Sequence, residues 1–476
     1  MTIGNLVQIE AKGPEDYILY GNPQVTYFQQ VYKRSVNFAI DIFKIPENHF
    51  NGIDLGSTIK FKVPFRGDLL GGIYLKVQHK DLKRTVAFID NYDDYDVDLS
   101  GTNFDDAYDP RFTSYVNGIG FNEIEYAKIY LNGVEFEHLN GEVIFLNNEL
   151  HNSYNRKKEF YKLTRFYPEE FRIGYTNQRD VLTYLHIPFF FTKDPSTYLP
   201  LCSLRNTEIQ VEIRFKPLEQ CLVRQFNYSG DTLPGVNGTL NSTTPNGIVP
   251  AQYERFMESV TGGIEFIELY MKSVYVEKDE QTRILKETKE ILIETLNVGT
   301  VERLMEPNGN KEYTFALDFY NPTKYIYWVI QREDVYNANQ YDNFTNNFRI
   351  CYGDGIYSYD QEDHLLKESI LLGNNVELIP VNDAIFLSSL QLYESFRAGT
   401  DYNIYIYNFA LNPCSSSPMG TLNFSKLLHK ELRLKLVDSS RYTDNGNRSS
   451  ILVRTYSHSF NMIIIKDGLA GLLYQN

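Results

Sequence analysis

The segment Thr207–Phe215, TEIQVEIRF, alternates strictly between apolar and polar side chains. Its apolar residues occupy every second position from Ile209 to Phe215. The same period recurs in Ser57–Phe65 and in Glu431–Leu436. A period of two predicts β-strands with one apolar face and one polar face. Strands of this kind are what two packed antiparallel sheets require.

Other segments extend this prediction along the chain. Further strands are expected at Glu123–Leu131, Glu265–Val276, Tyr313–Phe319, Tyr325–Gln331, Asn403–Phe409 and Ser459–Lys466. Helical periodicity is scarce, and the two best stretches are Glu142–Lys162 and Asp279–Thr288. Because strands do not alternate with helices, the pattern favours an all-β fold over a parallel α/β sheet.

The length of the chain indicates more than one sandwich. Single hydrophobic cores stop growing near roughly 250–300 residues, and this chain has 476 residues, of which 42% are hydrophobic and 14% aromatic. Pro217 directly follows the strand Thr207–Phe215, where a boundary would fit. We therefore expect an N-terminal arm (1–24), a first sandwich (25–217) and a second sandwich (218–476).

Net charge and hydropathy argue against several classes of protein. The formal net charge is −15, and proteins that wrap nucleic acid depend on clustered Lys and Arg, so no direct nucleic-acid partner is expected. Met1–Glu10 lacks a basic region followed by an apolar core, which argues against a secretory signal. Since no run of about 18 apolar residues occurs, we expect a soluble protein made in the cytosol.

Motifs that carry chemistry are missing from the sequence. It contains no HExxH, GxSxG or GxxxxGK[ST] pattern, so no catalytic residue, cofactor or metal is predicted. The cysteines Cys202, Cys221, Cys351 and Cys414 form no CxxC pair and are interpreted as free thiols, with disulfides or zinc as the alternatives.

One acidic loop, Asn91–Asp109, resembles the start of a calcium-binding loop. Asp94, Asp96 and Asp98 have the DxDxD spacing, but Leu99 stands where the turn needs Gly. A solvated loop is therefore favoured over a bound cation.

Three separated segments resemble the major capsid proteins of nucleocytoplasmic large DNA viruses. The first is GNPQVTYF at residues 21–28. The second joins YNFALNP at 407–413 to PMGTLNFS at 418–425. The third is GLAGLLYQN at 468–476. They occur in the family's order and spacing, and together they span the chain from about residue 20 onward.

The resemblance implies a non-enzymatic structural protein with two tandem eight-stranded jelly rolls. It implies a homotrimer that forms a pseudo-hexagonal capsomer and tiles an icosahedral virus shell, usually over an internal membrane. The implied partners are neighbouring capsomers and minor capsid proteins. The implied location is the virion, with synthesis and assembly in the host cytoplasm.

The signature segments supply candidate structural residues. These are Gly21, Asn22, Pro23, Pro418, Gly420, Asn423, Ser425, Gly468 and Gly471. Asn22-Pro23 predicts a bend at the end of an N-terminal arm. We expect this arm to contact neighbouring molecules, so a deletion of residues 1–20 should leave trimers intact but impair shell formation. Pro418 and Gly420 predict a tight turn, and Asn423 and Ser425 can hydrogen-bond its backbone. Gly468 and Gly471 allow backbones to approach closely in a final strand or tail.

Two other functions remain open at this stage. One is a minor capsid paralogue with the same fold. The other is a carbohydrate-binding protein built on a jelly roll, for which exposed aromatic rows would be needed. Trp328, the single Trp, lies within an apolar strand, which weighs against a sugar-binding platform.

Overall fold

The computed structural model describes most of the chain. The described residues are 22, 34–46, 52–88, 112–167, 180–225, 256–286, 288–305, 312–337, 339–346, 350–351, 357–358, 364–396, 399–437 and 450–474. The chain divides into two compact units, residues 1–38 and 39–476, and the fold described below is that of the second unit. The predicted acidic loop 91–109 and residues 23–28 of the first signature segment lie outside the described residues.

The first sandwich consists of two four-stranded antiparallel sheets around one core. The strand order of one sheet is β1 (Phe38–Lys44), β12 (Ile264–Val276), β3 (Leu69–His79) and β8 (Leu182–His186). The order of the other is β2 (Thr58–Lys62), β9 (Ile209–Phe215), β6 (Ile124–Leu131) and β7 (Val134–Leu139). Inward-facing residues of both sheets pack into one hydrophobic core.

Strand β9 confirms the prediction from which the sequence argument started. Its apolar positions are buried, while Arg214 on the polar face is exposed. Glu212, also on the polar face, is nearly buried because Tyr126 donates a hydrogen bond to it (2.7 Å) and Lys60 pairs with it (2.9 Å). Phe65 departs from the predicted pattern and is 51% exposed, since β2 ends at Lys62.

The second sandwich pairs a seven-stranded sheet with a four-stranded sheet. The larger sheet has the order β13 (Lys289–Val298), β24 (Ile451–Lys466), β16 (Pro322–Arg332) and β21 (Ile404–Asn408). Three short strands extend it, namely β14 (Glu302–Leu304) and β25 (Leu469–Leu472) on β24 and β22 (Leu422–Asn423) on β16. The smaller sheet has the order β15 (Glu312–Ala316), β23 (Lys430–Leu436), β19 (Leu366–Gly373) and β20 (Val376–Asp383).

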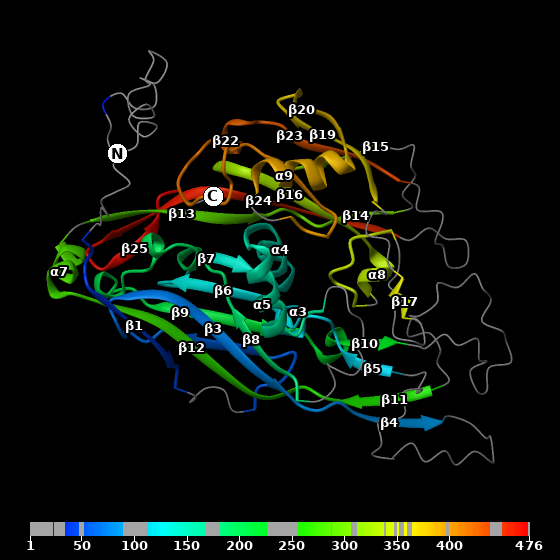
Figure 1. Cartoon of the computed structure of the whole chain (residues 1–476), viewed down its shortest axis with the longest axis horizontal. Helices are drawn as coiled ribbons and strands as arrows, with labels where there is room; N and C mark the ends of the chain where they lie inside the picture. Colours follow the sequence, from blue (N-terminus) through cyan, green and yellow to red (C-terminus); the bar gives the residue numbers. More distant parts are fainter. Residues whose placement is uncertain are drawn as a thin grey trace, which may run out of the picture. The chain divides into compact units, whose positions relative to one another are not determined.

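The central strands of the seven-stranded sheet are buried on both faces. Along β16, the odd-numbered residues from Tyr325 to Val329 pack in the core of the first sandwich. The even-numbered residues from Ile326 to Ile330 pack in a separate core against the four-stranded sheet. This sheet is therefore the middle layer of the unit (Figure 1). Burial on both faces explains why β16 reads as a continuous apolar run rather than an alternating one.

Strand pairing corrects the predicted division between residues 217 and 218. Strand β12 follows that position in the chain, but it pairs with β3 over ten registered residues, from Ile264↔His79 to Val274↔Leu69. A boundary at 217 would cut the first sandwich. The sequence between the sheets is helix α7 (Lys278–Lys286), after which β13 enters the second sandwich, so the pairing favours a division at α7.

Short helices and two-stranded ribbons connect these sheets. The remaining α-helices are α3 (Ile119–Asn122), α4 (Gly141–His151), α5 (Tyr154–Thr164), α8 (Glu333–Asn337) and α9 (Gln391–Ser395), the last preceded by a π-helix, η6 (Phe386–Leu390). The ribbons pair β4 (Lys83–Phe88) with β11 (Phe256–Thr261), β5 (Phe112–Tyr115) with β10 (Leu222–Gln225), and β17 (Ile350–Cys351) with β18 (Tyr357–Ser358). Short 3₁₀ turns are η2 (Phe190–Thr192), η3 (Pro195–Thr197), η4 (Leu201–Ser203), η5 (Leu218–Cys221) and η7 (Phe424–Lys426).

The predicted helix Glu142–Lys162 is two helices. Asn152 and Ser153 adopt extended backbone angles between α4 and α5, which ends the first helix and starts the second. Tyr154, the first residue of α5, is 69% exposed. No helix in the described part of the chain has the length and apolarity needed to cross a membrane.

Candidate assembly site: the polar junction around helix α4

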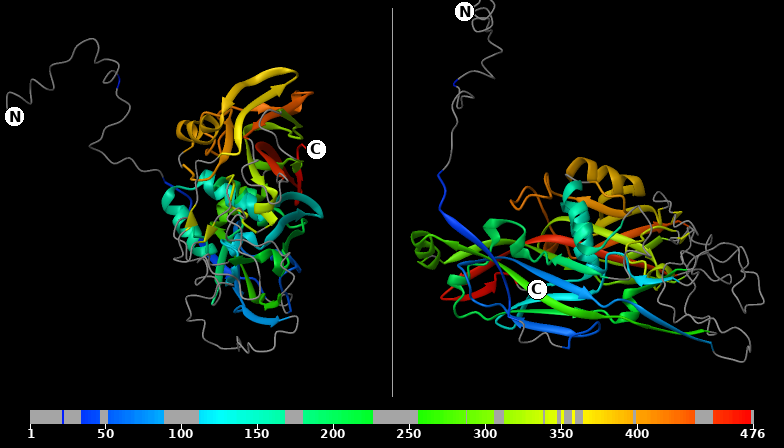
Figure 2. Two further views of the ribbon diagram at one scale, coloured as in Figure 1. Left: turned by 90° about the vertical axis from the view of Figure 1, so that its right-hand side faces the viewer. Right: turned by 60° about the horizontal axis from the view of Figure 1, so that its bottom comes forward.

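Helix α4 lies between the first sandwich and the middle sheet (Figures 1 and 2). Asn140 caps its start, since the Oδ1 atom accepts a hydrogen bond from the Val143 amide (2.8 Å). Nine of its eleven residues are buried. Gly141 allows the helix to approach so closely that an added Cβ would clash with the Phe121 carbonyl oxygen. The helix is thus packed on all sides, and its polar side chains must find partners inside the protein.

Glu142 connects the start of α4 to strand β24. Its Oε1 accepts hydrogen bonds from Arg454 Nε (2.8 Å) and from the Tyr456 hydroxyl (2.7 Å). The second arm of the Arg454 guanidinium donates to Gln331 Oε1 on β16 (2.6 Å). Burial raises the pKa of Tyr456 well above its usual value, so this hydroxyl stays a donor. The acid therefore joins one helix of the first sandwich to two strands of the middle sheet.

Glu149 makes a second connection, at the other end of the helix. Its carboxylate accepts from Lys157 Nζ (2.9 Å), the Tyr161 hydroxyl (2.6 Å) and the Thr400 hydroxyl (3.1 Å). Lys157 also donates to the Gly399 carbonyl (2.7 Å). The Lys157 and Glu149 side chains are only 5% and 1% exposed. This buried pair ties α4 and α5 to the loop that precedes β21.

A third connection is centred on Glu294 of β13. Lys193, which follows η2, lies 3.1 Å from its carboxylate, and Lys324 of β16 lies 2.6 Å from it. Burial acts to raise the pKa of Glu294, but the two lysines lower it to about 2. Glu137 of β7 lies nearby and accepts from the Phe190 amide (2.6 Å), and burial raises its pKa to about 7.

His151 and His458 complete the junction. Asn147 of α4 accepts from His458 Nε2 through its side chain (3.1 Å), and the Tyr325 hydroxyl lies 2.9 Å from His151 Nε2. The polar groups of α4 thus contact β16, β24 and the loop before β21. These paired polar groups therefore connect the helix to the middle sheet at several separate points. No group of His, Cys, Asp and Glu suited to a metal ion occurs among the described residues.

The sequence predicted none of these junction residues as functional. Each partner lies more than 100 residues from α4 in the chain, apart from Lys157 and Tyr161. A polar residue within a helix gives no sign of a partner at such a distance. The one available signal was Glu149, a charged residue beside the apolar positions Leu146 and Leu150.

Gly468 and Gly471 lie in the hairpin formed by β24 and β25. Asp467 and Gly468 form its two-residue turn, with φ of 54° and 83°, as in a type I′ turn. The Gly468 carbonyl accepts from the Thr207 hydroxyl (2.8 Å) in the first sandwich. The hairpin is therefore a further connection between the two sandwiches.

We expect Gly468→Ala to destabilise the protein by about 1–3 kcal/mol, because only glycine adopts this φ without strain. An added Cβ would also lie 2.9 Å from Asn206 Nδ2. Gly471→Ala is the matched control, since nothing lies within 4 Å of its Cβ position, and it should change stability by less than about 0.5 kcal/mol. Urea unfolding followed by the fluorescence of Trp328 measures both. Equal effects would contradict the role assigned to the turn.

The segment 418–425 forms a loop along β16. Gly420 has φ of 114°, and a Cβ there would lie 2.9 Å from the Phe409 carbonyl oxygen. The backbone carbonyl of Met419, which follows Pro418, accepts a hydrogen bond from the Leu411 amide (2.9 Å). Asn423 Oδ1 accepts from the Ser425 amide (3.0 Å), and the Ser425 hydroxyl accepts from the Asn321 amide (2.8 Å). These contacts hold the loop against the start of β16.

The N-terminal signature is described at one position only. Asn22 has φ of 50°, in the left-handed region that Asn tolerates better than most residues. Gly21 and Pro23 lie outside the described residues, as do Asp94, Asp96 and Asp98. Cys202, Cys221 and Cys414 form no disulfide within the described part of the chain.

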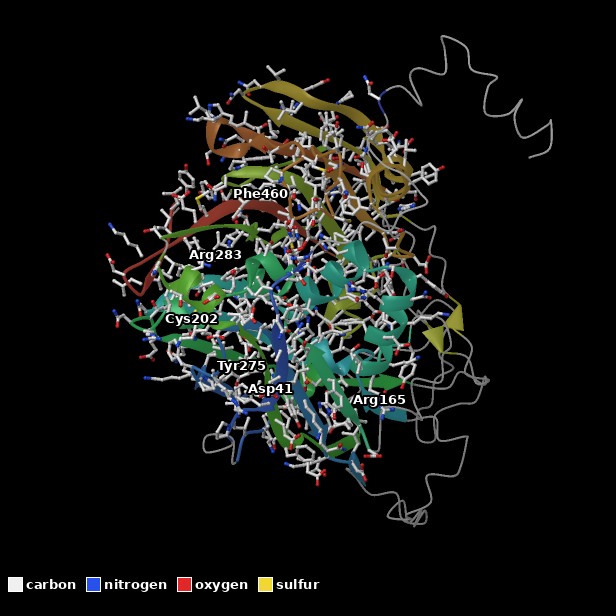
Figure 3. All side chains as sticks on the ribbon, turned by 60° about the vertical axis from the view of Figure 1, so that its left-hand side comes forward. Asp41, Arg165, Cys202, Tyr275, Arg283 and Phe460 are labelled. Carbon is white, nitrogen blue, oxygen red and sulfur yellow. The ribbon has the colours of Figure 1, made fainter. Side chains whose placement is uncertain are left out.

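Strand β1 presents an apolar row at the edge of its described sheet. Ile40 and Ile42 are 53% and 57% exposed on one face of the strand. Asp41, on the other face, pairs with Arg66 (3.2 Å). Figure 3 labels Asp41 on β1 and Tyr275 on the neighbouring strand β12. Exposed apolar edges of this kind promote association with another chain.

Comparisons with known proteins identify the family. The profile "Major capsid protein N-terminus" matches residues 26–253, and the profile "Large eukaryotic DNA virus major capsid protein" matches residues 280–471. The second match begins at residue 280, within α7, where the strand pairing also divides the chain.

Individual relatives cover almost the whole chain. The major capsid protein of Paramecium bursaria Chlorella virus 1 is 23% identical over 99% of this chain and 100% of its own length. Probable capsid protein 4 of Acanthamoeba polyphaga mimivirus is 22% identical, over 99% of each chain.

A solved structure shows the same fold. The quasi-atomic model of the PBCV-1 virus capsid contains a chain that matches with a TM-score of 0.68 and 18% identity, covering 95% of this chain and 100% of that one. Together with the sheets described above, this likeness confirms the predicted all-β, double jelly-roll fold. The chain belongs to the major capsid proteins of the large eukaryotic DNA viruses, a family of structural capsid proteins rather than enzymes.

Proposed function

We propose that three copies of this chain associate through a ring-closing interface into a pseudo-hexagonal capsomer that tiles an icosahedral virus shell. The observation that carries this proposal is the presence of two sandwiches held in one placement by the α4 junction. Three such chains supply six sandwiches, the number that a pseudo-hexagon needs. The likeness to a chain of the PBCV-1 virus capsid supports the same arrangement.

The exposed row on β1 is our candidate for part of the trimer contact. A ring of identical chains uses two different surfaces of each copy, and obligate interfaces of this type bury more than about 2,000 Å². Covering Ile40 and Ile42 would remove an apolar edge from water and close a sheet edge to other partners.

The solution mass of the purified protein tests the trimer. We expect three times the 55.4-kDa mass of the chain by light scattering. The double variant Ile40→Glu/Ile42→Glu should shift the protein toward single chains, because it places two carboxylates in the contact. Leu428→Glu is the control, since Leu428 is 86% exposed and lies outside β1. A wild-type monomer would refute the trimer, whereas a trimeric double variant would refute only the placement of the contact.

The proposal extends to partners and location. Neighbouring capsomers and minor capsid proteins would contact the outer surfaces of the trimer. An N-terminal arm (1–24) would reach adjacent molecules. Any contact with an internal membrane would be indirect. Synthesis and assembly would take place in the host cytoplasm. With a net charge of −15, the surface is unsuited to direct contact with nucleic acid.

A minor capsid paralogue of the same fold is the second candidate function. Probable capsid protein 4 of the mimivirus matches this chain at almost the same identity as the chlorella virus major capsid protein, so identity does not distinguish the two roles. Copy number in purified particles separates the two roles. A sugar-binding role is less well supported, since Trp328 is only 1% exposed and offers no face for stacking.

A further inference from the structure

The two histidines of the junction face each other across it. His151 ends helix α4, and His458 lies in the middle of β24. Their ring centroids are 5.4 Å apart. His458 is fully buried and stacks on the Tyr325 ring at 4.8 Å. A change of charge on either imidazole would therefore act directly between the first sandwich and the middle sheet.

The hydrogen bonds around both imidazoles fit the neutral rings. His151 Nδ1 lies 3.1 Å from the Asn147 carbonyl, which can only accept, so Nδ1 carries a proton, and in the neutral ring Nε2 accepts from the Tyr325 hydroxyl. His458 Nε2 donates to Asn147 Oδ1. His458 Nδ1 is buried and has no hydrogen-bond partner within the described part of the chain. A second proton on His458 would create a buried N–H group without an acceptor.

The surrounding charges also oppose protonation. Lys193 and Lys324 are the nearest cations, and the Lys324 Nζ lies 5.3 Å above the ring of Phe460, which is labelled in Figure 3. Both lysines pair with Glu294, and this carboxylate partly offsets them because it favours the protonated form of His151. Burial lowers the pKa of His151 to about 4 and lowers the pKa of His458 well below its usual value.

The other titratable groups around the pair come from five segments. They are Glu294 on β13, Lys324, Tyr325 and Tyr327 on β16, Lys193 after η2, Cys414 in the loop after β21 and, beside Lys193 and Glu294, Glu137 on β7. Burial raises the pKa values of Tyr325 and Tyr327 well above their usual range, so both stay neutral in acid. Glu137 takes up a proton near pH 7, and it is the one group here whose titration opposes that of the histidines.

We propose that His151 and His458 make the connection between the two sandwiches acid-sensitive, so that their protonation loosens α4 from the middle sheet. At neutral pH both rings fit as neutral hydrogen-bonding groups. Once protonated, they place two positive charges 5.4 Å apart beside two lysines. A shell made of such chains would keep its building blocks rigid at neutral pH and weaken them in acid.

The direction of the pH dependence follows from linkage. An unfolded histidine binds its proton near pH 6.5, whereas the folded protein resists protonation until a lower pH. Between these values the unfolded or opened state binds more protons, so stability falls as the pH falls from about 6.5 toward 4. Glu137 acts in the opposite sense, because its folded pKa is above its unfolded value and acidification favours the folded state.

Hydrogen–deuterium exchange of the full chain at pH 7.5 and 5.0 tests the proposal. After correction for intrinsic rates, the amides of α4 (residues 141–151) should lose at least tenfold more protection on acidification in the wild type than in His151→Gln/His458→Gln. Glutamine keeps a polar group near the imidazole Nε2 but cannot be protonated. His429→Gln, at an exposed histidine, is the control and should behave as the wild type does.

A second variant, Glu137→Gln, removes the carboxyl group whose titration opposes that of the histidines. In Glu137→Gln the histidines act alone, so the loss of α4 protection at pH 5.0 should be larger than in the wild type. If the double histidine variant does not fold, the Glu137→Gln protein decides the question without it. Protection of α4 that is equal or greater at pH 5.0 in that protein would overturn the proposal, as would equal pH dependence in the wild type and the double variant.

Discussion

Replacing Lys157 with Met lowers the free energy of unfolding by about 3–5 kcal/mol, the range expected when one partner of a buried ion pair is removed. The Glu149 carboxylate, 1% exposed, would be left with hydroxyl donors from Tyr161 and Thr400 but without a counter-charge. The Gly399 carbonyl would lose its donor as well. Denaturant unfolding followed by Trp328 fluorescence measures the loss.

Lys162→Met provides a closely matched control. It is the same substitution in the same helix, α5, but Lys162 and its partner Glu159 are 70% and 68% exposed. Exposed pairs contribute about 0–1 kcal/mol, so this variant should unfold almost as the wild type does. If both lysine variants were equally stable, the Glu149 connection would not hold the sandwiches together.

The second large effect is expected at Trp328. This side chain is 1% exposed in the core between the middle sheet and the four-stranded sheet. Trp328→Ala should cost about 3–5 kcal/mol, because the removed ring leaves a cavity. Circular dichroism during thermal unfolding measures the change, since the substitution removes the only Trp of the chain.

Trp328→Phe separates packing from polarity. The indole Nε1 is buried and has no hydrogen-bond partner among the described residues. Phenylalanine therefore removes an unsatisfied donor along with part of the ring, and the loss should stay below about 1.5 kcal/mol. A Phe variant as unstable as the Ala variant would mean that the indole N–H makes a stabilising contact.

Strands with one buried face and one more solvent-accessible face could be predicted from the sequence. Segments such as Thr207–Phe215 and Glu431–Leu436 carry their own period, because one face meets the core and the other meets water. Strand β13, which contributes to the middle sheet, was not predicted, since most of its residues are only partly buried and alternate weakly. The all-β fold could therefore be predicted from local alternation. The presence of a sheet packed between two others could not, because it depends on contacts with distant parts of the chain.

The boundary between the two sandwiches and the polar junction around α4 could not be predicted from local sequence patterns, because both depend on contacts between distant residues. That β12 returns to the first sandwich depends on its pairing with β3, almost 200 residues earlier. The partners of Glu142 are Arg454 and Tyr456, more than 300 residues away. A single sequence shows that Glu142 is a polar residue in a helix, and only the folded chain shows which groups it meets.

The position of β24 in the middle sheet has a consequence for biosynthesis. This strand separates β13 from β16 and also carries β14 and β25, but it is translated after β13, β14, β16 and β21. While a nascent chain emerges from the ribosome, β13 and β16 have no common neighbour and their apolar faces remain uncovered. The first sandwich can form during translation, whereas the second must wait for residues 451–466 and would engage chaperones until then.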